Sequence, residues 1–182
     1  FQVKWDKDVK KNGWDVNVDS AEVAAYLDES ESNLASTVVL ARLGTQTMLL
    51  TGDARGDDIL GGLRDAGHLV GSKSLLVDIL KIPHHGSDRN VTTSFFKKVR
   101  ANHYVVSGNG KHHNPDISTL EMIVEARGTA KYTVHSTYRK GKDGHEQRMD
   151  DFLAGLEPKI RDKFVFRPEN EISLSIDLAD PL

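Results

Sequence analysis

The chain has 182 residues, of which 38% are apolar and 28% are charged. This length suits one domain, and the composition is ordinary for a globular protein without a transmembrane segment. The formal net charge is −3 and no long basic block occurs, which argues against nucleic-acid binding through bulk charge. Because cysteine is absent, thiolate ligands are excluded, and histidine, aspartate and glutamate remain as candidate metal ligands.

The first third of the chain predicts an irregular segment, then a hairpin and a helix. Residues 1–33 are polar and rich in turn-forming residues. Two apolar, β-branched runs flank Gly44-Thr45, which is typical of an antiparallel hairpin whose second arm ends at Thr51-Gly52-Asp53. Apolar residues in 56–67 then follow helical spacing up to Gly67.

Strands and helices alternate through the rest of the chain. The run 75–82 has few polar interruptions, so it predicts a strand buried on both faces. The other expected elements are helices at 90–101 and 117–128, strands at 103–108 and 131–138, a helical stretch at 145–164 broken at Pro158, and a last strand at 171–178. This order predicts a single α/β domain with a mixed sheet and helices packed on it.

Three of the expected strand ends carry residues of metal-ligand type. Asp53 ends the hairpin, His84 and His85 follow the strand at 75–82, and the loop after 103–108 contains His112 and His113. If these strands are parallel neighbours, their carboxyl ends meet at one edge of the sheet. Imidazole and carboxylate suit zinc, manganese or iron. Adjacent histidines on a strand point to opposite faces, so both reach one ion only if the chain leaves strand geometry at Pro83.

Each of these features also has a simpler interpretation. Asp53 alone is an ordinary turn residue, the histidine pair alone is a surface loop, and the third loop alone leads into a helix capped by Asn114 or Asp116. Lys81 is a candidate phosphate contact or a solvated surface lysine. The remaining histidines are interpreted as ordinary surface or loop residues: His68, His103, His135 and His145.

Three segments resemble the metallo-β-lactamase fold superfamily: "LASTVVLARLGTQTMLLTGDA", "VDILKIPHHGSD" and "HYVVSGNGKHHNPD". The resemblance is to the hydrolase domains similar to the one attached to bacterial DNA-uptake channel (competence) proteins, and it covers roughly residues 33–137. It implies half of an αββα sandwich. It also implies metal-dependent hydrolysis of a phosphodiester or another ester by activated water, with two Zn²⁺ ions, or alternatively Mn²⁺ or Fe²⁺.

The resemblance also implies roles for individual residues. Asp53 matches the aspartate that bridges two ions, and His84 matches a metal ligand. His85 matches a ligand or a proton donor. Asn114 stands where the family has a histidine, so His113 or His112 is expected to replace it, with His113 as a catalytic candidate. Two residues are expected to contact substrate: Ser87 and Asn114.

The superfamily's H-x-[HD]-x-D-H motif has no counterpart before Asp53. We therefore expect the C-terminal half of a longer hydrolase, with an irregular segment at 1–33, a motif-bearing part at 34–137 and a C-terminal helix and strand at 138–182. Its expected partner is the missing N-terminal half, in the same precursor or in a separate chain. A phosphoester or nucleic acid is the expected substrate, and the expected location is cytoplasmic, with an extracytoplasmic domain as the alternative. The competing interpretations are an inactive partner-binding or scaffold module and a closed structural site for one metal.

Overall fold

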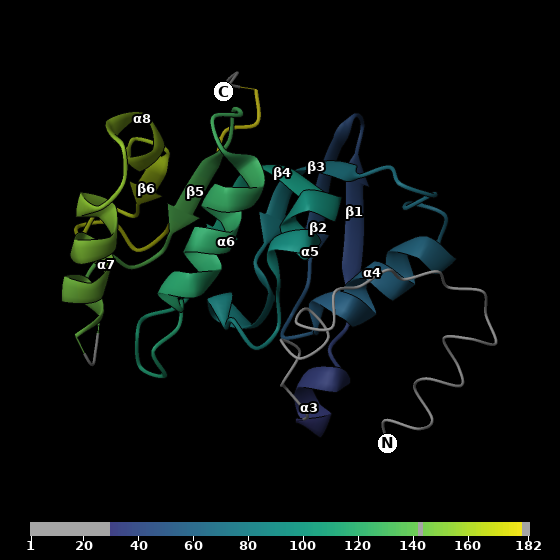
Figure 1. Ribbon diagram of the computed structural model, residues 1–182, viewed down its shortest axis with the longest axis horizontal. Coiled ribbons are helices and arrows are strands. Elements are labelled where there is room, and N and C mark those ends of the chain that lie inside the picture. The colour runs from purple at the N-terminus through teal and green to yellow at the C-terminus, as the bar shows by residue number, and fades with distance from the viewer. Residues whose placement is uncertain (1–29, 142–143, 180–182) are drawn as a thin grey trace.

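The protein is built on one six-stranded sheet with the order β1-β2-β3-β4-β5-β6 (Figure 1). The structure is a computed structural model that describes residues 30–141 and 144–179. β1 and β2 pair antiparallel, and every later neighbour is parallel, which confirms the predicted mixed sheet. The strands are β1 (Val39–Leu43), β2 (Gln46–Leu50), β3 (Leu75–Lys81), β4 (Val99–Val106), β5 (Thr133–Ser136) and β6 (Phe164–Phe166).

The predicted hairpin is confirmed. Val39 pairs with Leu50 and Leu43 with Gln46, so the turn falls on Gly44 and Thr45. Gly44 has a φ of +59°, which glycine adopts without steric cost. Of the irregular segment predicted at 1–33, residues 1–29 lie outside the described residues, and the short helix α3 (Glu31–Leu34) follows them.

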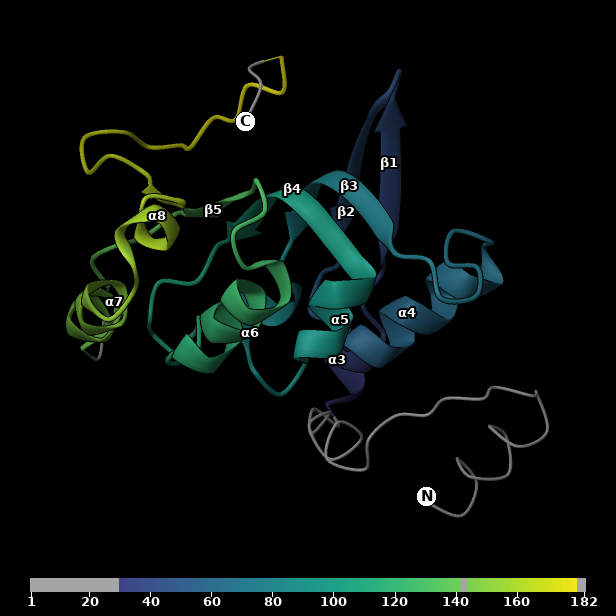
Figure 2. The same cartoon turned by 45° about the horizontal axis from the view of Figure 1, so that its top comes forward.

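Three helices cover one face of the sheet (Figures 1 and 2). They are α4 (Gly56–Asp65), α5 (Thr93–Lys98) and α6 (Ile117–Arg127). The hydroxyl of Thr92 accepts a hydrogen bond from the Phe95 amide at 3.1 Å, so Thr92 caps α5 as the sequence suggests. The core between sheet and helices includes fully buried side chains from both layers: Leu49, Leu80, Phe95, Phe96, Tyr104, Leu120 and Ile123.

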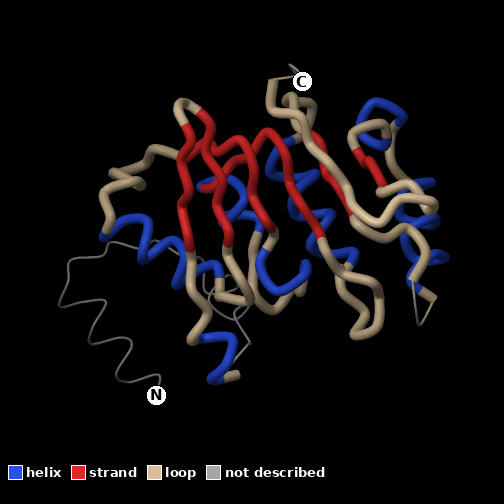
Figure 3. Tube along the Cα trace, turned by 180° about the vertical axis from the view of Figure 1, so that it is seen from behind, coloured by secondary structure: helices blue, strands red, loops and turns tan. Residues whose placement is uncertain are grey.

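The opposite face of the sheet is largely open (Figure 3). The chain after β6 passes in front of part of it in this view, whereas α4, α5 and α6 lie behind the strands. Large apolar side chains at the β1–β2 edge point to this face, alternate with Leu40 and Leu49, and are exposed: Val39, Leu43 and Leu50. The prediction that the strand at 75–82 is buried on both faces is confirmed in part: Val77 and Leu80 point to opposite faces and are both buried, whereas Leu76 near the start of the strand is 49% exposed.

The C-terminal region follows the predicted elements in part. The helical stretch predicted at 145–164 with a break at Pro158 is confirmed as α7 (His145–Ala154) and α8 (Pro158–Arg161), and the unpredicted β6 overlaps it only at Phe164. The predicted last strand at 171–178 is wrong, because no strand forms there. Leu174, Ile176 and Leu178 are half-buried in alternation with exposed neighbours, but β6 already holds the place beside β5. The alternation of half-buried and exposed residues in this segment therefore reflects packing on one side only, without pairing to another strand.

Three of the histidines interpreted as surface or loop residues are buried instead. His103 lies in β4 and His135 in β5, while His145 begins α7. His103 Nδ1 and His135 Nε2 are 3.0 Å apart. Only His68 is exposed, as expected. No helix in the described ranges is both long and apolar enough to cross a membrane.

Candidate functional site at the sheet edge

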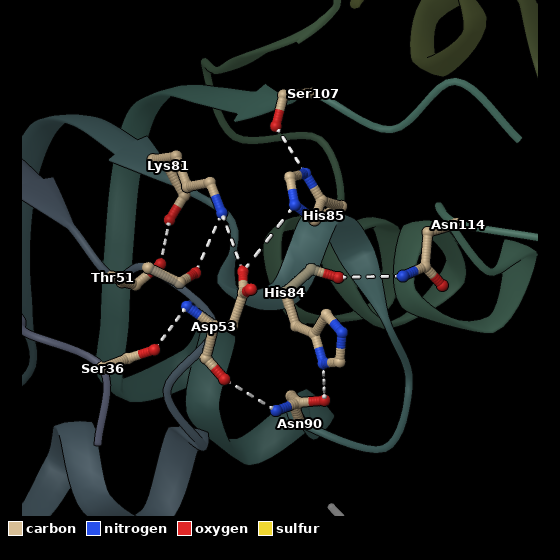
Figure 4. A network of polar contacts seen from close by, with 10 residues as sticks. Ser36, Thr51, Asp53, Lys81, His84, His85, Asn90, Ser107 and Asn114 are labelled. Carbon is tan, nitrogen blue, oxygen red and sulfur yellow. Dashed lines mark hydrogen bonds and ion pairs between the residues drawn. The ribbon is translucent and has the colours of Figure 1, made fainter. Parts of the chain in front are cut away.

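The candidate site lies where β2, β3 and β4 end. These strands are neighbours, and β3 runs parallel to both of the others. Their carboxyl ends therefore meet at one edge of the sheet, as the sequence analysis required. Figure 4 shows the result, in which Asp53, Lys81 and His85 point toward one another while His84 turns to Asn90.

Asp53 stands at the centre of this network. Gly52 turns the chain with a φ of +53°, and the Asp53 amide donates to Ser36 Oγ at 3.1 Å. Lys81 Nζ and His85 Nε2 each lie 3.8 Å from Asp53 Oδ1. The carboxylate is thus held between two nitrogen groups and remains partly exposed, with 35% of its side chain open to solvent.

Lys81 is bound to the Asp53 turn and is not a solvated surface lysine. Its Nζ donates to Gly52 O at 2.9 Å, and its own carbonyl accepts from Thr51 Oγ1 at 2.7 Å. Only 21% of the lysine side chain is exposed. Burial lowers the pKa of Lys81, and the negative charge of Asp53 opposes that shift.

The two histidines occupy a tight turn, η1 (Pro83–Gly86), in which the chain has left strand geometry. Their φ angles are +44° for His84 and +56° for His85, and their ring centroids are 6.5 Å apart. A left-handed conformation is uncommon for residues other than glycine and needs support from the surrounding structure. This geometry satisfies the condition under which both rings can approach one edge of the sheet.

His84 is oriented by Asn90. The distance from His84 Nδ1 to Asn90 Oδ1 is 2.9 Å, and the Asn90 amide nitrogen donates to Asp53 O at 3.1 Å. Because a carbonyl oxygen only accepts, Nδ1 of His84 must carry the proton, so Nε2 of the neutral ring has a lone pair. A hydrogen bond from the second ring nitrogen to a carbonyl is usual for metal-binding histidines.

His85 is held by a different contact. Its Nδ1 lies 2.9 Å from Ser107 Oγ, just beyond β4, while its Nε2 faces Asp53. Burial lowers the pKa of His85, and the positive charge of Lys81 lowers it further, whereas Asp53 acts in the opposite direction. A lowered pKa favours the neutral ring, which can act as a ligand or as a proton acceptor.

The loop after β4 supports the histidine turn. The side chain of Asn114 donates to His84 O at 3.1 Å, and the Ser87 amide donates to the same oxygen at 3.0 Å. Substrate contacts by Ser87 and Asn114 stay predictions, and in the structure both residues brace the turn. His113 is exposed, has a φ of +66°, and its carbonyl accepts from Arg148. The catalytic role of His113 stays a prediction. The alternative that the exposed His112 takes the place of the family's histidine also stays a prediction.

Asp116 occupies the N-cap position of α6, but its side chain makes no capping hydrogen bond to the helix. Its carboxylate accepts from the Asp88 amide at 3.0 Å, and the Ser118 hydroxyl donates to Asp88 at 2.7 Å. Burial raises the pKa of Asp116. This pair joins the loop after η1 to α6, so the histidine turn is fixed from both sides.

Asn90 and Ser107 are site residues that the sequence did not indicate. Asn90 is fully buried and bridges the loop after η1 to the Asp53 turn. The only sequence signal is a polar residue six positions after the first histidine, which many loops contain. Its role depends on contacts between strands that are distant in sequence.

Replacing Asn90 with alanine is expected to lower the free energy of unfolding by about 2 kcal/mol, because the buried partners lose their hydrogen bonds. Urea denaturation measures this loss. The matched control is Asn102→Ala, which removes one bond of a half-buried asparagine, from Asn102 Nδ2 to Asp78 Oδ1 at 3.2 Å. A loss in Asn90→Ala no larger than in this control would show that the bridge does not stabilise the turn.

The donor set fits a metal ion only in part. Asp53 and His85 offer an oxygen and a nitrogen on the same edge, and the tautomer of His84 suits a ligand. Within residues 30–141 and 144–179, however, no group of three or more potential ligands is assembled. Zinc sites use three or four protein ligands, and the described residues bring together fewer than three.

Comparison with known proteins identifies no family. No family model matches the chain, and no solved structure matches it significantly. A local similarity of 33% identity over 75 residues links it to microtubule-associated protein 1A of Rattus norvegicus and of Mus musculus, and one of 32% to that of Homo sapiens. The aligned part covers 38% of this chain and 3% of each relative. These matches are too partial to assign the chain to a family.

Proposed function

We propose that this chain contributes one half of a metal-dependent hydrolase similar to the metallo-β-lactamase superfamily. The observation that carries the proposal is the approach of Asp53 and His85 at the shared carboxyl edge of β2, β3 and β4. The open, partly apolar sheet face supports the proposal, since a second half of an αββα sandwich would cover such a face.

In this proposal the residues have distinct tasks. Asp53 and His85 would hold a divalent cation together with ligands from the complementary half, and His84 would add a further nitrogen. When bound, the cation activates water and polarises the bond to be cleaved. His85 Nδ1 and Ser107 Oγ form a short path for a proton away from the edge. Asn90 keeps His84 in its tautomer.

The proposed substrate is a phosphodiester or another ester, and the proposed ion is Zn²⁺, with Mn²⁺ or Fe²⁺ as alternatives. The proposed partner is the missing N-terminal half, in the same precursor or as a separate chain. A nucleic acid is one possible phosphodiester, although the net charge of −3 does not favour it.

The test is metal binding by the full chain and by the assembly that purifies with it. Asp53→Asn is expected to weaken Mn²⁺ or Zn²⁺ binding at least about tenfold, because it removes the only charged ligand of the set. Calorimetry and elemental analysis measure binding, and bis(4-nitrophenyl) phosphate reports hydrolysis by the assembly. The matched control is Asp65→Asn, at an exposed position where α4 ends.

Equal affinity in Asp53→Asn and the unmodified chain would contradict the proposal. A second polypeptide carrying H-x-[HD]-x-D-H, with about two metal ions per assembly, is the expected positive result. It would be found by intact-mass analysis of the native preparation.

A second candidate is a partner-binding or scaffold module without catalysis. Two observations favour it: the incomplete ligand set among the described residues, and the exposed apolar side chains of Val39, Leu43 and Leu50 on the open face. The local similarity to proteins named as microtubule-associated is compatible with a binding role. This candidate predicts that no metal binds under any pairing of chains, which the same calorimetry decides.

A further inference from the structure

Lys81 contacts the acidic residue of the candidate site directly. Its Nζ lies 3.8 Å from Asp53 Oδ1 and donates to Gly52 O at 2.9 Å. The lysine is therefore tied to both the carboxylate and the backbone of the Asp53 turn (Figure 4). An ammonium group in this position neutralises the carboxylate at close range.

The contacts of Lys81 are built into the strand and are not a chance surface arrangement. Lys81 is the last residue of β3, and Thr51 Oγ1 donates to its carbonyl at 2.7 Å. The side chain is 21% exposed, so the group is partly withdrawn from water. Partial burial strengthens the attraction between ammonium and carboxylate relative to a pair in bulk solvent.

We propose that Lys81 is the resident counter-ion of Asp53, and that a divalent cation binds Asp53 only by displacing the lysine ammonium. This inference rests on the proposed function, because it concerns the same carboxylate. A cation and Lys81 compete for one negative charge, and the two positive charges repel each other across a few ångströms. Metal binding by this chain is therefore weak until further anionic ligands favour the exchange.

The test compares Mn²⁺ binding in Lys81→Met, Lys81→Arg and the unmodified protein. Calorimetry measures it for the full chain and for the assembly that purifies with the chain. We expect Lys81→Met to bind Mn²⁺ about three- to tenfold more tightly, because the competing charge is gone. Lys81→Arg retains the positive charge and is expected to keep the original affinity. The charge-matched control is Lys98→Met, which also loses a lysine that donates to a backbone carbonyl, Ser72 O at 3.3 Å; its affinity is expected to stay unchanged.

A second measurement reads the ion pair without metal. Lys81→Met is expected to lower the melting temperature in the unmodified background and to lower it less when Asp53 is already asparagine. An equal change in both backgrounds would overturn the counter-ion assignment.

The metal data separate the two proposals. If the unmodified chain binds Mn²⁺ and Lys81→Met binds it no more tightly, only the counter-ion inference fails. If neither the assembly that purifies with the chain nor its Lys81→Met variant binds metal, the proposed hydrolase function fails, and the displacement fails with it.

Discussion

Replacing Gly86 with alanine is expected to lower the free energy of unfolding by about 3 kcal/mol and to displace the histidine turn. Gly86 has a φ of +89°, and a Cβ at this position would lie 2.7 Å from Pro115 Cβ. The carbonyl of Gly86 also accepts from the Asp116 amide at 2.9 Å. Backbone strain and steric overlap thus act together, and denaturant unfolding at neutral pH measures their sum.

The matched control is Gly62→Ala in α4. An added Cβ at Gly62 meets nothing within 4 Å, and alanine is the better helix former by up to about 1 kcal/mol. The control is therefore expected to stabilise the protein slightly. If Gly86→Ala lowers the free energy of unfolding by less than about 1 kcal/mol, the close packing of η1 on Pro115 does not hold the site.

Acid is expected to destabilise the protein through the buried histidine pair of β4 and β5. His103 and His135 are 7% and 8% exposed, and within the described chain His135 Nδ1 is buried without a hydrogen-bond partner. Burial, and then the neighbouring His103, lowers the pKa of His135 from 6.5 to about 4. Burial also lowers the pKa of His103, while the charge of Asp78 acts in the opposite direction.

The unfolded chain therefore binds more protons than the folded chain between pH 6.5 and about 4. The contribution of neutral His135 to the free energy of unfolding is fully present above pH 6.5, and it falls as the pH decreases through this window. The expected contribution of His135 is about 3 kcal/mol. Urea denaturation at a series of pH values measures this loss.

His135→Gln isolates the contribution, because glutamine keeps a donor toward His103 Nδ1 and does not titrate. Carboxylates titrate in both proteins, so the difference between them reports the histidine. The control His68→Gln changes an exposed ring and is expected to keep the acid dependence of the unmodified protein. Parallel stability profiles of His135→Gln and the unmodified chain would contradict the assignment.

The arrangement of the site could be predicted from the order of elements along the chain. A hairpin arm followed by alternating helices and strands implies parallel neighbours with a common carboxyl edge. Asp53 and His85 meet there because β2 and β3 are paired. The parallel pairing of two strands joined by a helical crossover follows from general rules of chain topology. These two residues therefore converge without any special sequence feature near either of them.

The conformation of the histidine turn could not be predicted. Nothing in Pro83–Gly86 marks His84 and His85 for left-handed angles, which single residues other than glycine rarely adopt. Hydrogen bonds from Asn90 and Asn114, which lie outside the turn in the sequence, hold it. Tertiary hydrogen bonds decide the geometry in this case, and local propensity does not contain them.

The burial of His103 and His135 was missed for a related reason. Histidine is intermediate in its preference for burial. The sequence of a short strand with a single histidine therefore does not indicate that the ring is buried. The pairing of β4 with β5 aligns Val105 with His135 and brings the two rings within hydrogen-bond distance. Each ring provides a hydrogen-bond partner for the other, and the sequence of neither strand alone indicates this contact.

The junction between antiparallel and parallel pairing at β2 has a consequence for how the chain folds. The β1–β2 hairpin closes over a two-residue turn, whereas Met48 pairs with Ile79 and Ile79 with His103, far along the chain. Local contacts form faster than contacts that close long loops. We therefore expect the hairpin to form early and the edge that joins Asp53, Lys81 and His85 to assemble late, so a partly folded chain carries the ligands without the site.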